Sequence, residues 1–191
     1  WSTAVGLNAG ENNQSNSSVA VGHAAAQNNQ GSDAVAVGVA AANYGQNNGS
    51  VAVGQRAAHG WDYNINNTAI QGYDAVAIGS YAGEVGQGNY AVAVGNEAGN
   101  RYQSHGSVAI GDYAGQNYLS TDAVAIGTYA QQNGSGWAPI AIGRYAGQNS
   151  QGSQSIAIGS NAGNSGLGYH AIALGRYAAS NGSGQYAIAI G

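Results

Sequence analysis

The chain contains no cysteine, so it can form neither a disulfide nor a thiolate metal site. Proline occurs only once, at Pro139. No apolar run approaches the roughly 18 residues that a membrane-spanning helix needs. The sequence therefore predicts neither a disulfide framework nor insertion of this segment into a membrane.

Charge is also scarce. Only 6% of the residues are charged and the formal net charge is -4. Lysine is absent, and the cations are Arg56, Arg101, Arg144 and Arg176. Such a chain has no basic patch for a nucleic acid or an anionic membrane, and we expect neither as a partner.

A five-residue motif recurs along the whole chain: a small residue, a β-branched residue, Ala, a branched aliphatic residue and Gly. The motif ends at Gly6, Gly22, Gly38, Gly54, Gly79, Gly95, Gly111, Gly127, Gly143, Gly159, Gly175 and Gly191. Successive glycines are 16 residues apart, except that Gly54 and Gly79 are separated by 25. Strict self-similarity at a short period is typical of a solenoid, in which each coil covers its neighbours.

Each coil can be read from its motif Gly, counted as position zero. In every copy, position −3 is β-branched, position −2 is Ala and position −1 is Val, Ile or Leu. This alternation predicts a β-strand. We expect the Val and Ile ladders to fill the interior, and Ala at −2 with Ser or Ala at −4 to form a flat outward face. A continuous apolar face is unusual on a monomer, so we expect another subunit to cover it, with an exposed functional face as the alternative.

The rest of the coil is predicted to fold back. Position +3 is Ala in every complete copy and position +4 is Gly or Ala in all but one, which predicts a short return strand. Segments such as residues 27–32 have turn chemistry, because Gly and Asn tolerate positive φ. We predict an all-β parallel β-solenoid, a single domain over residues 1–191 with about 12 coils of 16 residues. The enlarged coil, residues 55–79, should carry an extruded loop.

The titratable residues do not converge on a catalytic or metal site. No two carboxylates share a coil position in adjacent coils, so paired carboxylates for acid–base chemistry are not expected. The four histidines lie at different coil positions, and only His59 and Asp62 fall close together, as a weak metal pair. We therefore predict no enzyme, no catalytic residue, no metal site and no cofactor.

The motif itself resembles a known family. Ser-Val-Ala-Val-Gly at 18–22 and 50–54 and Ser-Val-Ala-Ile-Gly at 107–111 each have Ala three residues after the glycine, and they resemble the head repeats of YadA-type trimeric autotransporter adhesins. Ala-Ile-Gly-Arg-Tyr-Ala-Gly-Gln-Asn at 141–149 is similar to repeats in phage and giant-virus fibre proteins. The resemblance implies a left-handed β-roll, three chains side by side, and a rigid extracellular stalk or receptor-binding head.

Two groups of aromatic residues are candidates for ligand or partner contacts. Position +2 is tyrosine in five coils, and we expect a stacked ladder that stiffens the rod, with a sugar-stacking platform as the alternative. The enlarged coil adds two aromatic residues, either as a binding loop or as a cover for the core. The candidates are Trp61, Tyr63, Tyr81, Tyr113, Tyr129, Tyr145 and Tyr177.

These observations predict a structural or adhesive segment of an extracellular fibre, from a viral tail fibre or a bacterial surface adhesin. Its expected partners are copies of itself, as a homotrimer or an end-to-end filament, and surface glycans or a host receptor. The chain opens and closes within a repeat, so we expect a slice of a longer fibre or a subunit that stacks end to end. The alternatives are an ice-binding protein that uses the flat Ala/Ser face and a self-stacking extracellular filament subunit.

Overall fold

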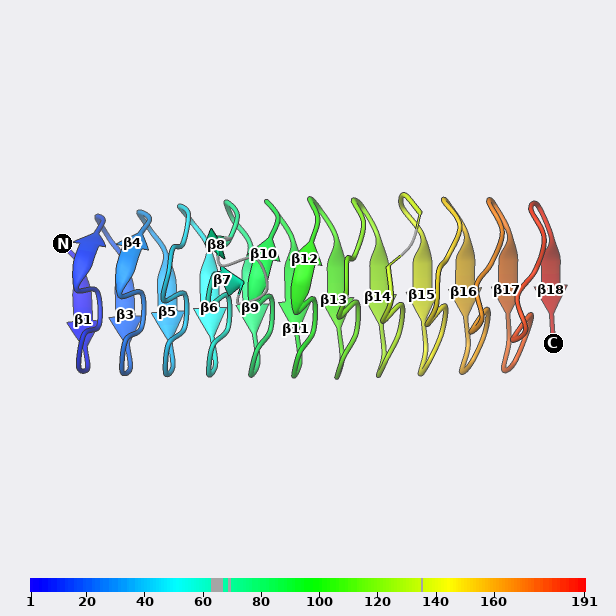
Figure 1. Cartoon of the computed structure of the whole chain (residues 1–191), viewed down its shortest axis with the longest axis horizontal. Helices are drawn as coiled ribbons and strands as arrows, with labels where there is room; N and C mark the ends of the chain where they lie inside the picture. The colour runs from blue at the N-terminus through cyan, green and yellow to red at the C-terminus, as the bar shows by residue number, and fades with distance from the viewer. Residues whose placement is uncertain (63–66, 69, 135) are drawn as a thin grey trace.

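The computed structural model describes residues 1–62, 67–68, 70–134 and 136–191, which form a parallel β-solenoid of about 11 turns (Figure 1). Each turn contributes one strand to a 12-stranded sheet that runs the length of the molecule. No helix occurs in these residues. The strands of the sheet are β1 (Thr3–Val5), β3 (Val19–Val21), β5 (Val35–Val37), β6 (Val51–Val53), β9 (Val76–Ile78), β11 (Val92–Val94), β13 (Val108–Ile110), β14 (Val124–Ile126), β15 (Ile140–Ile142), β16 (Ile156–Ile158), β17 (Ile172–Leu174) and β18 (Ile188–Ile190).

Neighbouring strands of this sheet pair in register, with like residues over like. Val108 of β13 pairs with Val124 of β14, which pairs with Ile140 of β15. The register also holds across the enlarged coil, where Val51 of β6 pairs with Val76 of β9. The predicted solenoid and its ladders are therefore confirmed.

The orientation of the strands is the reverse of the one we predicted. The central alanines point into the coil: Ala109, Ala125 and Ala141 are completely buried. The first and last residues of each strand face outward and are half-buried or exposed. The prediction that Val and Ile ladders fill the interior is wrong, because the walls of a 16-residue coil lie close together and long side chains from the return side fill the space between them. Only alanine then fits on the sheet side. Position −4 is also buried in every coil except the first and last, so the Ala/Ser face that the ice-binding hypothesis requires lies inside the coil.

The return side of the coil also differs from the prediction. Its strands are β2 (Asn12–Gln14), β4 (Asn28–Gln30), β10 (Val85–Gln87) and β12 (Arg101–Gln103), which begin at position +6 and not at +3. Isolated parallel bridges continue this side, for example from Asn117 to Asn133. The alanines at +3 lie in the turn before it and are buried. Residues 28–30, which we expected in a turn, form β4, because parallel pairing satisfies their backbone groups.

A row of glutamines occupies the interior opposite the alanines. Gln14, Gln30, Gln46, Gln71, Gln87 and Gln103 lie at the same position in successive coils, and each side-chain amide before Gln103 donates to the next Oε1 at 3.0–3.3 Å. Each amide also bonds to a strand carbonyl, as Gln87 Nε2 does to Val76 O at 2.7 Å. A row of this kind satisfies its own polar groups inside the fold. Leu119 and Leu167 take the same position farther along the chain.

Gln151 occupies the same coil position, but neither adjacent coil has a glutamine there. Its Nε2 atom is buried and has no hydrogen-bond partner. We expect Gln151→Leu to raise the free energy of unfolding by about 1 kcal/mol, because it removes an unsatisfied donor. Ser155 Oγ, which donates to Gln151 Oε1, also bonds to Gly152 O at 2.8 Å and keeps that partner. Thermal melting should show a rise of about 2–4 °C.

The matched control for this prediction is Gln87→Leu, within the intact row. It should lower the free energy of unfolding by about 1–3 kcal/mol, because it strips partners from the glutamines on both sides. Equal changes in melting temperature for the two variants would contradict the assigned role of the row.

Candidate functional site

The outward face of the 12-stranded sheet is apolar along its whole length. We call it the branched face; it consists of the first and last residues of each sheet strand, from Thr3 and Val5 of β1 to Ile188 and Ile190 of β18. These side chains are half-buried or exposed in the single chain. Thr3 is the only one that is not a branched aliphatic residue. The face is therefore a flat, regular surface of Val and Ile methyl groups.

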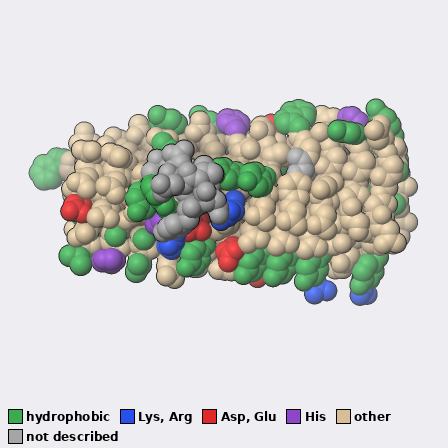
Figure 2. All heavy atoms as spheres, in the orientation of Figure 1, with side chains coloured by type: hydrophobic (Ala, Val, Ile, Leu, Met, Phe, Trp, Pro, Cys, Tyr) green, Lys and Arg blue, Asp and Glu red, His purple; other side chains and the backbone are tan. Residues whose placement is uncertain are grey.

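The described part of the insertion in the enlarged coil starts from the return side of the coil. The chain leaves the return side after Gly60 and forms β7 (Trp61–Asp62) and β8 (Asn67–Thr68), which pair antiparallel (Figure 1). In Figure 2, hydrophobic, Arg and acidic side chains gather on this face near the enlarged coil. The branched face thus runs uninterrupted past the enlarged coil, since Val51 and Val76 pair directly.

The aromatic residues of the insertion are described in part. The Trp61 ring is half-buried and lies 5.1 Å from the Tyr44 ring, tilted by 35°. Tyr44 in turn meets the imidazole of His59 edge-on at 5.1 Å. Trp61 therefore packs on the return side of the coil as well as facing solvent. Tyr63, the other predicted contact of this loop, lies outside the described residues.

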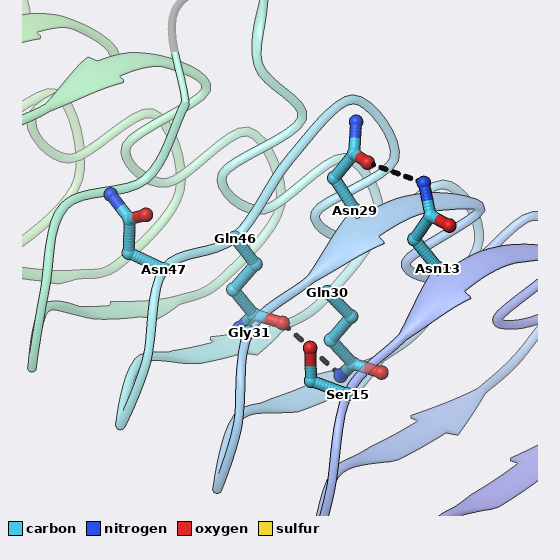
Figure 3. Close-up of a pocket in the computed structure, with 7 residues that line it drawn as sticks. All are labelled: Asn13, Ser15, Asn29, Gln30, Gly31, Gln46 and Asn47. Carbon is cyan, nitrogen blue, oxygen red and sulfur yellow. Dashed lines mark hydrogen bonds between the residues drawn. The ribbon is translucent and has the colours of Figure 1, made fainter.

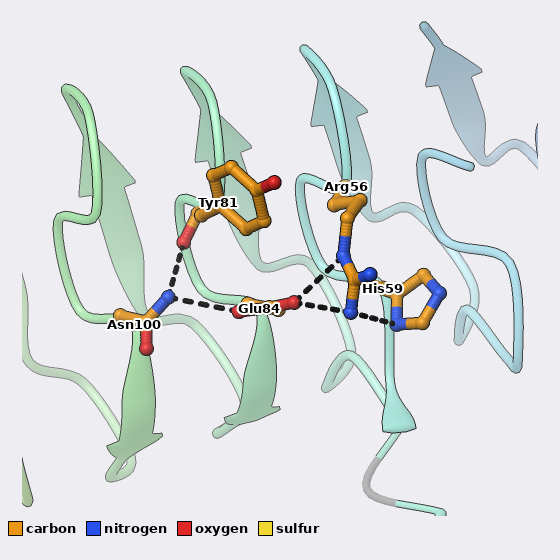
Figure 4. A network of polar contacts seen from close by, with 5 residues as sticks. All are labelled: Arg56, His59, Tyr81, Glu84 and Asn100. Carbon is orange, nitrogen blue, oxygen red and sulfur yellow. Dashed lines mark hydrogen bonds and ion pairs between the residues drawn. The ribbon is translucent and has the colours of Figure 1, made fainter. Parts of the chain in front are cut away.

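A polar network lies at the root of this insertion (Figure 4). Arg56 forms an ion pair with Glu84 at 2.7 Å, and its Nη2 lies 3.4 Å from His59 Nδ1. Asn100 Nδ2 donates to the second Glu84 oxygen at 3.1 Å and to the Tyr81 carbonyl at 3.0 Å. The network extends a row at position +5, which is polar in every coil and continues as bonds such as Gln132 to Gln116 at 2.9 Å.

His59 and Asn100 are the buried members of this network, and His59 has a relative exposure of 5%. Burial, and then the neighbouring Arg56 guanidinium, lower the pKa of the imidazole to about 4. His59 is therefore neutral in the folded chain at pH values at which an unfolded chain would protonate it. The His59 imidazole contacts Arg56 and Tyr44, and the side chain of Asp62, the other member of the predicted metal pair, lies outside the part of the chain that the structure describes.

The pKa of His59 predicts a pH dependence of stability. Between pH 6.5 and about 4 the unfolded chain binds a proton that the folded chain does not, so the free energy of unfolding should fall as the pH is lowered through this window. The contribution is about 2–3 kcal/mol. The variant His59→Gln should remove this pH-dependent contribution. Glutamine fits the position, since Gln27 and Gln116 occupy it in other coils. Urea titrations at pH 7 and pH 4 measure the difference, and exposed His23→Asn is the control. Equal pH dependence in His59→Gln and the unchanged chain would contradict this role.

The tyrosines at position +2 form the predicted column. The Tyr113 and Tyr129 rings are 4.9 Å apart and inclined by 3°, and the Tyr129 and Tyr145 rings are 5.2 Å apart and inclined by 8°. Glu97 lies at one end, where its carboxylate raises the pKa of the Tyr113 hydroxyl, and Arg144 lies 5.1 Å over the Tyr145 ring at the other. Because the rings cover one another, the geometry favours packing over the sugar-platform alternative.

The two remaining tyrosines of position +2 stand apart from this column. Arg56 lies over the Tyr81 ring at 5.5 Å, and Arg176 lies over the Tyr177 ring at 4.9 Å. Both contacts are of the cation–π type. Tyr81 is half-buried and Tyr177 is 52% exposed.

A hollow of about 210 Å³ lies on the return side near the N-terminal coils (Figure 3). It is lined by Asn13, Ser15, Asn29, Gln30, Gly31, Gln46 and Asn47. Asn13 Nδ2 donates to Asn29 Oδ1 at 3.0 Å and Gln30 Nε2 to Gln46 Oε1 at 3.2 Å. These amides already bond to one another, so we assign the hollow no ligand.

The described residues contain no group of three or more His, Asp or Glu side chains placed to hold a metal ion. Nor do they include a helix that is long and apolar enough to span a bilayer. Comparison of the chain with protein-family models, curated proteins and solved structures gave no match.

Proposed function

We propose that this chain is a structural segment of an extracellular adhesive fibre, in which three copies associate side by side through the branched face. The observation that carries the proposal is the outward orientation of the Val and Ile ladders over 12 strands. The fibre is rigid because ladder hydrogen bonds join every coil to the next. Its exposed turns and aromatic side chains are then available for attachment to a virion's host or a bacterial target surface.

The choice of side chains on this face supports association. Threonine has the same β-branched shape as valine and would offer water a hydroxyl group, yet it occurs on this face only at Thr3. An apolar sheet surface of this length is unusual on a monomer and typical of a permanent subunit interface. The branched residues thus serve as an interface between chains, whereas alanine and glutamine form the interior of each chain.

The number of copies is taken from the resemblance and not from the face itself. A ring of three closes when each chain offers one part of its branched face to each of its two neighbours. Three copies agree with the resemblance to trimeric adhesin repeats noted above. The branched face is continuous past the enlarged coil, because β6 and β9 pair directly.

The proposal predicts the effect of a charge on the branched face. Ile126 is the outward last residue of β14, at the middle of the face. In Ile126→Glu, carboxylates from all three copies would be brought together without water, so association should weaken by more than a hundredfold. Light scattering coupled to size exclusion should give three times the chain mass for the unchanged protein and a smaller, still folded species for the variant.

Ser160→Glu is the control, since it places the same charge at position +1, where Arg144 and Arg176 occupy the adjacent coils. It should keep the three-chain mass. A stable monomer of the unchanged protein at tens of micromolar would overturn the proposal. Open-ended polymers would overturn it as well, in favour of a self-stacking filament.

A further inference from the structure

We define the outer turns as the turns just before each sheet strand. Their sequence repeats every two coils, in addition to the single-coil repeat of the strands. From the enlarged coil onward, the residue three positions before each strand is alternately a ring and a small or polar residue. The sequence of these residues is Tyr73, Asn89, His105, Thr121, Trp137, Ser153, Tyr169 and Gln185. The four rings thus recur every second coil, although the coil itself has a single-repeat period.

These rings face solvent. Tyr73 is 48% exposed, Trp137 53% and Tyr169 52%. His105 is also exposed, and its imidazole meets the Tyr90 ring of the preceding turn edge-on at 5.4 Å. Hydrophobic and histidine side chains lie at intervals along the upper edge of the molecule in Figure 2, where these turns lie. The row is therefore on an accessible edge, on different residues from the branched face.

The intervening residues fix the backbone of the rings. Asn89 Oδ1 accepts a hydrogen bond from the Tyr73 N–H at 3.0 Å, and Ser153 Oγ accepts one from the Trp137 N–H at 3.0 Å. Each of these polar side chains belongs to the coil that follows its ring. The backbone of Tyr73 and of Trp137 is therefore held by the following coil, which lowers the entropic cost of binding a ligand.

The spacing of the rings identifies a class of ligand. Two coils rise by about 9.6 Å, twice the distance between hydrogen-bonded strands. An extended β-1,4-linked polysaccharide is a ribbon with a two-fold screw, so every second sugar presents the same apolar face, at about this repeat. Aromatic rings bind such faces because they are flat and amphipathic. We propose that the outer-turn row, Tyr73, His105, Trp137 and Tyr169, binds an extended β-1,4-linked glycan along the rod.

The charges of the outer turns favour an uncharged glycan. Asp74 and Asp122 directly follow two residues of the alternating series, and none of the four arginines lies in these turns. A polyanionic polysaccharide would find repulsion there and no cationic partner. The inference deepens the adhesive part of the proposed function by naming the class of ligand.

Retention on insoluble chitin and cellulose, and titration with chitohexaose and cellohexaose, would test the site. Trp137→Ala and Tyr169→Ala should each weaken binding about tenfold, as expected for the loss of one stacked ring. Maltohexaose, whose α-linkages curve the chain away from the row, should bind at least tenfold more weakly. Tyr177→Ala is the matched control, because Tyr177 is 52% exposed like Tyr169 but lies on the opposite edge; it should bind as the unchanged protein does.

A register variant makes the test specific to spacing. The exchange Trp137→Ser with Ser153→Trp keeps the composition but moves one ring by a coil, so it should also weaken binding about tenfold. Full binding by the exchanged variant, equal losses in Tyr177→Ala and Tyr169→Ala, or no binding to any β-1,4-linked glycan would each overturn the inference. The three-chain mass is measured separately, so loss of glycan binding with an intact assembly rejects this site and leaves the association standing.

Discussion

Replacing Ala125 by Glu is expected to destroy the folded solenoid. Ala125 is the central residue of β14, is completely buried, and pairs with Ala109 and Ala141 on either side. The interior there is so narrow that a longer side chain cannot fit, and the carboxylate would lose its water without gaining a partner. We expect a loss of at least about 4 kcal/mol in the free energy of unfolding.

The effect should spread beyond one coil, because each coil of a solenoid is stabilised by its neighbours. Circular dichroism should show loss of β-structure, and size exclusion should show an expanded or aggregated chain. Ile126→Glu supplies the comparison, since the same charge one residue later points outward and should leave each chain folded. If Ala125→Glu melted like the unchanged protein, the inward orientation of the central alanines would be wrong.

Gly95→Ala is expected to be nearly as damaging, for a reason that concerns the backbone. Gly95 has φ +131°, a conformation that residues with a side chain rarely adopt. A Cβ at this position would lie 2.6 Å from the carbonyl oxygen of Gly111 and 2.8 Å from its carbonyl carbon. Both are backbone atoms of the next coil, so they cannot move aside without breaking the ladder. We expect a loss of about 3–5 kcal/mol, measured by urea unfolding.

Gly184→Ala is the matched control for this prediction. A Cβ at Gly184 would meet nothing within 4 Å, and its φ lies outside the left-handed region. The variant should be as stable as the unchanged protein or slightly more so, since alanine restricts the unfolded chain. Comparable losses in both variants would show that close contact between successive corners does not explain the motif glycine.

The period, the parallel pairing and the register could be predicted from the sequence, because identical residues at a fixed spacing have only one way to stack. The orientation of the strand could not be predicted in the same way. Alternation of Val, Ala and Val is the same pattern whichever face is inside, and the general rule places the larger apolar residue inward. Here the thinness of the coil overrides the rule, so Ala125 is interior and Val124 is not.

A signal for the true orientation was present in the glutamines. A residue as long as Gln87, repeated in adjacent coils, occupies the interior only if the opposite wall is made of alanine. The sequence also contained a signal for the place of His59. Its coil position, +5, is polar in every coil, which indicates a row of hydrogen-bonded side chains. The pairing of Arg56 with Glu84 could not be foreseen, because the insertion separates these residues by 28 positions.

The tyrosine column and the ring row show how much of the surface chemistry depends on coil position. Tyr113, Tyr129 and Tyr145 were predicted to stack because they occur in consecutive coils, and they do. Rings at alternate coils, such as Trp137 and Tyr169, are too far apart to stack on one another and remain open to solvent. Whether aromatic residues occupy every coil or every second coil therefore decides between a closed stack and an open row.

Strand pairing continues in register across the enlarged coil, from β6 to β9, and this has a consequence for how the gene can change. Val53 pairs with Ile78 although 25 residues separate them, because the surplus sequence leaves on one side and the strand returns to its place. Duplication or deletion of one whole repeat should thus leave every junction chemically unchanged and alter only the reach of the rod, by about 4.8 Å. Length in such a molecule is a heritable quantity that unequal recombination can tune in uniform steps.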